Sequence, residues 1–261
     1  MNKLPTYLYK YRTLSTQNGL RFAEDMLVNR QAYFAPAMSF NDPFEGQTAI
    51  SFVADRQFKQ DWFTKNLQKY FGMSKKTALR EAKKKIANAT MVEPVLETSL
   101  RKLIREAIGI FCLSEKSNNI LMWSHYADGH KGICIELKPS SSTHLKFFRN
   151  SMPVLYQNRF PVIEYYNDQS SEGDQAIAAH ATKDSNWAYE KEWRVFSMGG
   201  SEVQTLPEGL ISGVIMGCAI SDEHRHLVLE WASQTSPRIS VYQSSIMAGQ
   251  YSLEVRKLRL E

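Results

Sequence analysis

Trp187-Ala-Tyr-Glu-Lys-Glu-Trp-Arg194 is the stretch of the sequence around which the fold and the function are predicted. If it forms a strand, its side chains alternate between two faces, so Glu190 and Glu192 lie on the same face. Two neighbouring carboxylates repel each other, and the pKa of one should rise unless a cation lies between them. Proteins tolerate this cost mainly at catalytic or ligand-binding sites, but a solvent-facing edge strand with counterions also fits the spacing. Both interpretations remain open on this stretch alone.

The composition indicates a soluble protein with a substantial core. The chain has 261 residues, of which 43% are hydrophobic, enough for one large domain or two small ones. Its net charge of +5 is too small to indicate a nucleic-acid binder by itself, although much of it lies between Lys75 and Lys85. The three cysteines are far apart, which argues against a disulfide framework or a zinc ribbon. The N-terminus resembles no signal peptide and no run is long enough to span a membrane, so we expect a cytoplasmic protein without a membrane partner.

Hydrophobic periodicity predicts a single α+β domain over residues 1–261, with a central mixed or antiparallel sheet. Residues 55–107 carry three helical apolar stripes and are predicted to form a helical insertion. The lysines at 75–85 form either a solvated face of this insertion or a contact for nucleic-acid phosphates. The other predicted elements are strands at 7–12, 32–35, 107–114, 132–138, 153–157, 161–166, 187–198, 210–216, 239–243 and 251–260, helices at 20–27, 119–127, 175–181 and 221–231, and a polar loop at 167–174.

Several common chemistries have no support in the sequence. Neither a Gly-x-Gly-x-x-Gly motif nor a Gly-Lys-Ser/Thr phosphate loop occurs, and the dispersed Cys and His residues lack metal-ligand spacing, so no metal site is predicted. His125 follows Ser124, but no Gly-x-Ser-x-Gly elbow and no partnered acid support a serine nucleophile. The turn Ser39–Gly46 is either an ordered surface turn or one wall of a polar pocket, because Asn41 and Asp42 lie on a loop anchored by aromatics.

The order of three elements along the chain is more specific than any one of them. Arg12 ends the first predicted strand, Ser114 ends a central strand, and Glu190-x-Glu192 follows on a later strand. This order resembles the Arg–Ser–Glu arrangement of ADP-ribosyltransferases, whose fold also begins with strand, helix and strand. Nearly the whole chain is similar to an uncharacterised bacterial family, domain of unknown function 2971, through the blocks Tyr9-Lys-Tyr-Arg12, Phe40-Asn-Asp-Pro-Phe-Glu45, Phe111-Cys-Leu-Ser114, Leu121-Met-Trp-Ser-His-Tyr-Ala127, His130-Lys-Gly132 and Tyr189-Glu-Lys-Glu-Trp-Arg194.

The transferase resemblance implies NAD as the substrate and a role for each of these residues. Cleavage at the nicotinamide ribose passes through an oxocarbenium-like state, which Glu192 would stabilise with its charge. Glu190 would orient or deprotonate the acceptor. Arg12 would hold the phosphates or ribose of NAD, and Ser114 would hydrogen-bond to Glu192. The other residues expected to bind NAD are Tyr126, Trp123, His125, Asn41 and Asp42, where Tyr126 or Trp123 would stack on nicotinamide unless it packs in the core.

Two features depart from the transferase pattern. The strand that should read like Ser-Thr-Ser is Cys112-Leu-Ser-Glu115, and a long helical insertion separates the first motif from the second. The acceptor of ADP-ribose is left open among protein, RNA, DNA and water, and the oligomeric state is unknown. A toxin or anti-phage defence role would suit a bacterial enzyme that consumes NAD, by analogy of class alone.

A metal-dependent nuclease is the main alternative. Asp128 lies upstream of Glu136-Leu-Lys138, and an acid followed by Glu-x-Lys resembles a site in which carboxylates hold a divalent ion and lysine polarises the phosphate. The basic helix at 75–85 would then contact the nucleic acid. A third interpretation is a non-catalytic module that binds a ligand or a nucleic acid.

Overall fold

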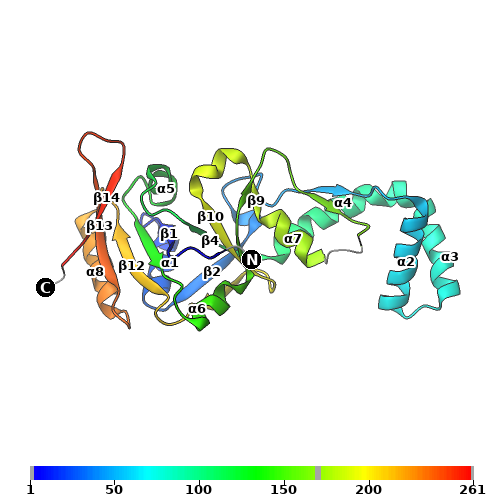
Figure 1. The fold of residues 1–261 in the computed structure, drawn as a ribbon, viewed down its shortest axis with the longest axis horizontal. Coiled ribbons are helices and arrows are strands. Elements are labelled where there is room, and N and C mark those ends of the chain that lie inside the picture. The colour runs from blue at the N-terminus through cyan, green and yellow to red at the C-terminus, as the bar shows by residue number, and fades with distance from the viewer. Residues whose placement is uncertain (1–2, 168–171, 260–261) are drawn as a thin grey trace.

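A mixed β-sheet organises the structure (Figure 1). The computed structural model describes residues 3–167 and 172–259, and ten strands of this part form the sheet. β10 (Glu192–Ser197) pairs with β4 (Gly109–Ser114) and with β6 (Ser151–Pro153), while β12 (Ile211–Met216) and β13 (Ser240–Ile246) pair in parallel. The main path of the sheet runs through β11 (Glu202–Thr205), β2 (Gln31–Pro36), β4 (Gly109–Ser114), β1 (Leu8–Arg12), β5 (Ile133–Leu137), β12 (Ile211–Met216), β13 (Ser240–Ile246) and β14 (Leu253–Lys257). The predicted α+β class is confirmed.

The sheet opens on one side of β4. Tyr9 of β1 pairs with Ser114 at the end of β4, whereas Ala35 of β2 pairs with Ile110 near its start. Between these two points the ammonium of Lys10 donates a hydrogen bond of 2.8 Å to the carbonyl oxygen of Cys112. A side chain therefore satisfies a carbonyl on the edge of β4 where β1 diverges, as a buried backbone group requires.

Side chains alternate along β1, and each face of the sheet has its own apolar layer. Leu8 belongs to the larger core, which α1 (Gln17–Leu27) and α8 (Asp222–Gln234) cover. Tyr11 faces the other way, where α5 (Ile120–Tyr126) packs Met122 and Trp123 against it. The smaller elements α6 (Ser142–Phe147), η2 (Phe148–Asn150), β7 (Leu155–Tyr156), α7 (Glu172–His180) and β9 (Thr182–Lys183) complete the body.

Three helices follow one another between β3 (Ala49–Ser51) and β4: α2 (Arg56–Phe71), α3 (Lys75–Ala87) and α4 (Ala89–Ala107). Asp55 caps α2 by accepting from the N–H of Phe58, and Gly72 ends it with φ of 63°. Ser74 caps α3 in the same way. α2 and α3 pack on each other at the end of α4 that lies farthest from the sheet (Figure 1). We call these two helices, residues 56–87, the arm.

The prediction of a strand over 187–198 is wrong in its first half. Asp184 accepts from the N–H of Asn186 and starts the short helix η3 (Ser185–Glu190). Lys191 then takes a left-handed φ of 47°, and the strand β10 begins only at Glu192. A polar cap competes locally with the extended conformation that the aromatics favour. Residues 168–171 of the predicted polar loop and residue 260 of the last predicted strand lie outside the described part.

None of the described helices is both long and apolar enough to cross a membrane.

Candidate functional site

A cavity of about 180 Å³ lies where β1 diverges from β4. β1 and β4 form its floor, α5 forms one wall, and the loop after η1 (Ala37–Ser39) forms another. We call this cavity the cleft. Its lining combines aromatic rings with charged groups and comprises Tyr9, Lys10, Tyr11, Phe40, Asn41, Cys112, Leu113, Ser114, Met122, Tyr126, Lys183, Glu190 and Glu192.

Glu190 and Glu192 both reach the cleft, although they do not share a strand. The ammonium of Lys183 lies 2.6 Å from Glu190 Oε2 and 3.5 Å from Glu192 Oε2. The hydroxyl of Tyr126 donates to Glu190 Oε1 at 2.6 Å. A cation therefore does lie between the two carboxylates, and all three charged side chains are buried. The left-handed Lys191 turns the chain so that residues 190 and 192 point to the same side.

Arg194 continues this network into the interior. Its guanidinium is fully buried and donates to both oxygens of Glu192, at 3.0 Å from Nε and 2.9 Å from Nη2. It also donates to both oxygens of Glu45 and to the carbonyl oxygen of His180. Bidentate pairing of this kind fixes direction as well as charge. Three carboxylates and two cations thus form one buried cluster, which we call the ion network: Glu45, Lys183, Glu190, Glu192 and Arg194.

The environment moves the pKa values of the two cleft glutamates in opposite directions. Burial raises the pKa of Glu190, and the nearby charge of Glu192 adds to this although Lys183 opposes it. Burial alone would also raise the pKa of Glu192, but the charges of Arg194 and Lys183 outweigh it and lower that pKa to about 2. One carboxylate is held ionised and its neighbour takes up a proton more readily, which is a pattern of acid–base sites.

The backbone that carries Glu190 is anchored by two side chains. Ser114 Oγ donates to the carbonyl oxygen of Glu190 at 2.6 Å, and Asn119 Nδ2 donates to that of Tyr189 at 2.7 Å. The expectation that Ser114 would bond to the carboxylate of Glu192 is therefore wrong. Ser114 instead holds the backbone of Glu190, and this bond fixes the position of η3 relative to β4.

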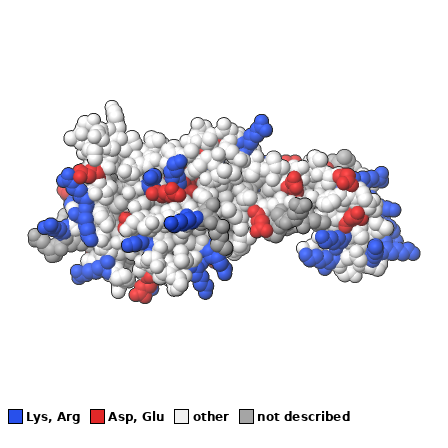
Figure 2. All heavy atoms as spheres, in the orientation of Figure 1, with Lys and Arg blue, Asp and Glu red and all other residues white. Residues whose placement is uncertain are grey.

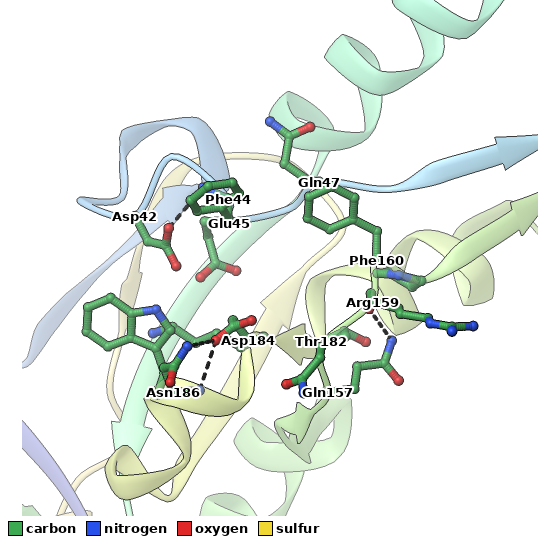
Figure 3. Close-up of a pocket in the computed structure, with 14 residues that line it drawn as sticks. Asp42, Phe44, Glu45, Gln47, Gln157, Arg159, Phe160, Thr182, Asp184 and Asn186 are labelled. Atoms are coloured by element: carbon green, nitrogen blue, oxygen red, sulfur yellow. Dashed lines mark hydrogen bonds between the residues drawn. The ribbon is translucent and has the colours of Figure 1, made fainter.

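A second cavity, of about 480 Å³, lies beside the ion network (Figure 3). Lys183 lines this cavity as well as the cleft, so the two are neighbours. Figure 3 shows the carboxylates of Asp42, Glu45 and Asp184 around one side of it. The loop that carries Asn41 and Asp42 separates the two cavities: Asn41 lines the cleft, whereas Asp42 lines the second cavity.

Four residues expected to bind NAD lie outside the cleft: Asp42, which lines the second cavity, and Arg12, Trp123 and His125. Arg12 occupies the opposite face of the sheet, where its guanidinium lies over the ring of Phe22 in α1. The alternation along β1 causes this, since Tyr9 and Tyr11 take the face of the cleft. Trp123 is fully buried and donates its indole N–H to the carbonyl oxygen of Ser117. Trp123 is therefore a core residue, which was the alternative to its stacking on nicotinamide.

His125 is exposed on α5 and lines neither the cleft nor the second cavity. On the same helix only Tyr126, among the aromatic residues expected at the NAD site, faces the cleft. The one-residue offset between the two places their side chains about 100° apart on a helix of 3.6 residues per turn.

The residues of the nuclease alternative do not converge. Asp128 lies in the turn before β5 and Lys138 follows its end, so a strand of five residues, roughly 17 Å long, separates them. Glu136 accepts a hydrogen bond from Ser212 Oγ at 2.7 Å. Within the described residues no group of three or more His, Cys, Asp or Glu side chains could hold a metal ion.

One segment of the chain matches a known protein family, and this segment contains four of the five residues of the ion network. Residues 122–195 match the family model described as Protein of unknown function (DUF2971). The predicted similarity to this family is thus confirmed over these residues. The matched DUF2971 segment runs from α5 to β10 and includes Tyr126, Lys183, Glu190, Glu192 and Arg194. No curated protein and no solved structure matches the chain.

Sequence reasoning missed four charged residues of the site. Arg194 had a usable signal, because a residue two positions after Glu192 on a strand lies on the same face. Glu45 ends a block already quoted for the family resemblance. Lys10 interrupts an aromatic strand, which is a weaker signal. Lys183 had none, since β9 is only two residues long and carries no periodicity.

Proposed function

We propose that the cleft binds NAD and that the protein is an ADP-ribosyltransferase-like enzyme. It would cleave the nicotinamide–ribose bond and transfer ADP-ribose to a protein or nucleic-acid acceptor. One observation carries this proposal: two buried carboxylates with opposite pKa shifts face one aromatic-lined cleft. Glycosidic bonds are cleaved by such pairs, in which one group stabilises positive charge and the other handles a proton.

Glu192 is the group that stabilises the oxocarbenium-like state. Its carboxylate stays ionised because Arg194 and Lys183 lower its pKa to about 2, and the bidentate contact with Arg194 holds it in place. A fixed negative charge in a buried site costs no reorganisation when positive charge develops on the ribose.

Glu190 is the group that accepts a proton from the acceptor nucleophile. Its raised pKa makes it a stronger base than an exposed glutamate, and the hydroxyl of Tyr126 orients its Oε1. The second cavity lies on the far side of Lys183 and provides space for the acceptor.

Lys10 supplies the positive charge for the phosphates of NAD in place of Arg12. Lys10 lines the cleft, and its ammonium bonds to the carbonyl oxygen of Cys112 in the gap between β1 and β4, whereas the guanidinium of Arg12 lies over Phe22 on the opposite face of the sheet. Burial and the charge of Arg12 lower the pKa of Lys10 to about 8, so the group is still mainly protonated at pH 7.

The test is release of nicotinamide from labelled NAD in the presence of mixed protein and nucleic-acid acceptors. Glu192→Gln should reduce release at least about a hundredfold, because it removes the charge that stabilises the transition state. The exposed Glu230→Gln serves as the matched control and should leave release unchanged. No release by the unmodified protein with any acceptor, or undiminished release by Glu192→Gln, would refute the proposal.

Tyr126→Phe gives a second test that leaves the ion network intact. The hydroxyl of Tyr126 lowers the pKa of Glu190, so its removal should raise that pKa further. The acid limb of the pH–rate profile should then move to higher pH, while the folded state persists in circular dichroism. An unchanged profile would remove Glu190 from the mechanism.

A non-catalytic module that binds a ligand is the second candidate. It is favoured by the fact that both carboxylate oxygens of Glu192 already accept hydrogen bonds from Arg194. In that case Glu192→Gln keeps its affinity for NAD in calorimetry and no preparation turns NAD over. The variant Glu192→Gln therefore distinguishes the two candidates.

A further inference from the structure

The arm concentrates the positive charge of the chain. Between positions 56 and 87 ten Lys or Arg residues face two Asp or Glu residues, whereas the rest of the sequence has 22 basic and 25 acidic residues. Figure 2 shows blue side chains gathered at the end of the molecule where the arm lies. A net-acidic body joined to a basic arm repels a polyanion at one end and attracts it at the other.

The outer surface of α3 carries most of this charge. Ala78 and Ala82 are buried against α2, which leaves the opposite side of α3 to lysines and Arg80. Lys75, Lys76 and Lys83 are exposed, and among the described residues they make no ion pair. Glu81 is the one acidic residue in the sequence of α3 and pairs with Arg80 and Lys84, so this helix keeps a large excess of positive charge.

Exposed aromatic rings accompany the lysines at the turn between α2 and α3. Tyr70 is 67% exposed and Phe71 is 72% exposed, and the ammonium of Lys69 lies 4.8 Å from the ring centre of Tyr70. Rings beside basic groups are the combination with which proteins bind unpaired bases and their phosphates.

We propose that the arm binds single-stranded nucleic acid. Lysines of α3 would contact phosphates, and Tyr70 and Phe71 would stack on bases. A membrane surface is disfavoured, because binding to it requires a continuous apolar helix face. The apolar side chains of α2 and α3 are used in packing on each other, and Trp62 also packs on Tyr165 and Tyr166. This inference does not depend on the reaction proposed for the cleft.

The experiment measures anisotropy of a fluorescein-labelled 20-nucleotide single strand with the full chain, without NAD, at several salt concentrations. Replacing Lys75, Lys76 and Lys83 together by Gln should weaken binding roughly tenfold or more. It should also reduce the slope of log affinity against log salt by about 2, since each phosphate contact on a single strand contributes about 0.7.

The matched control replaces three exposed lysines of the body, Lys131, Lys146 and Lys257, by Gln. It should leave the affinity and the salt slope unchanged. Equal weakening in both triple variants, or no binding by the unmodified chain at 50 mM salt, would overturn the proposal.

Two further arms of the experiment test the choice of partner. Tyr70→Ala with Phe71→Ala should lower affinity for the single strand about fivefold or more without changing the salt slope, because stacking releases no counterions. Affinity for a duplex of the same sequence should be weaker. Equal affinity for the duplex, or binding to phosphatidylserine vesicles that the strand does not displace, would overturn the assignment.

Discussion

The ion network and the arm use charged residues in opposite ways. In the ion network five charged side chains are buried, and each lies against a partner of opposite sign. On the arm the charges are mostly exposed and nearly all of one sign. A buried charge without a partner costs several kcal/mol, whereas an exposed ion pair contributes about 0–1 kcal/mol.

This difference separates two kinds of function. The ion network can position two carboxylates closely enough for chemistry, but only if every member is present. The arm can lose single exposed charges with little structural consequence, and its effect on a distant polyanion is a sum over many charges. Removing one charge from the ion network should therefore lower the free energy of unfolding far more than removing one charge from the arm.

Arg194→Met should have the largest effect on stability. It leaves Glu45 and Glu192 buried without their shared cation, at a cost of about 3–5 kcal/mol in the free energy of unfolding. Denaturant titration measures it. Arg12→Met is the matched control, because Arg12 has no carboxylate partner among the described residues and contacts Phe22 and Met26 instead. Its change should stay below about 1 kcal/mol; equal losses would mean that the carboxylates do not need Arg194.

Acid should destabilise the protein through Glu192. Its pKa is lowered from 4.5 to about 2 in the folded state, so the unfolded chain holds that proton more tightly. The resulting stabilisation is complete above about pH 4.5 and is lost as the pH falls toward 2, on the order of 3 kcal/mol. Unfolding at a series of pH values should show this slope, and Glu192→Gln should flatten it.

Glu190→Gln should change the same slope in the other direction. The pKa of Glu190 is raised, so its protonation in acid favours the folded state and partly offsets the loss at Glu192. Without Glu190 the acid loss should become steeper. If both variants flatten the slope, the two carboxylates do not have opposite shifts.

Ser114→Ala should have a moderate effect on stability. It removes the donor to the carbonyl oxygen of Glu190 and the acceptor for the N–H of Lys116, at a cost of about 1–3 kcal/mol. Ser233→Ala, on the exposed side of α8, is the control and should cost less. Since Ser114 anchors η3, nicotinamide release should also fall; a change in stability alone would limit Ser114 to a structural role.

The triple replacement of Lys75, Lys76 and Lys83 by Gln should have the smallest effect on stability. Exposed residues without partners usually change the free energy of unfolding by less than about 0.5 kcal/mol each. Thermal unfolding should therefore coincide with that of the unmodified chain. A large loss would show that these lysines support the arm itself.

The regular elements of the fold could be predicted because their apolar periodicity is strong. β1, α1 and β2 follow the predicted strand, helix and strand, and residues 56–107 form the three helices of the insertion. The stretch Trp187–Arg194 could not be predicted in the same way. A single cap by Asp184 and the left-handed φ of Lys191 decide its conformation, and neither leaves a periodic signal.

The site was predicted in part. The convergence of Glu190, Glu192 and Tyr126 at one cleft was expected, and their contacts now give the reason. The placement of Arg12 was wrong, because the order of motifs along a chain does not say which face of a strand a side chain takes. Lys183 could not be foreseen, since only the tertiary structure brings it to the carboxylates.

The contact between Glu45 and Arg194 has a consequence for how the chain can fold and change. These residues are 149 positions apart, and the arm lies inside the loop that their contact closes. Loop-closure entropy grows only with the logarithm of length, so removing the 32 residues of the arm from this loop would alter its closing free energy by only about 0.2 kcal/mol. An insertion of this size is therefore nearly free of entropic cost to the site. The arm could be lengthened, shortened or exchanged while the carboxylates of the cleft keep their positions.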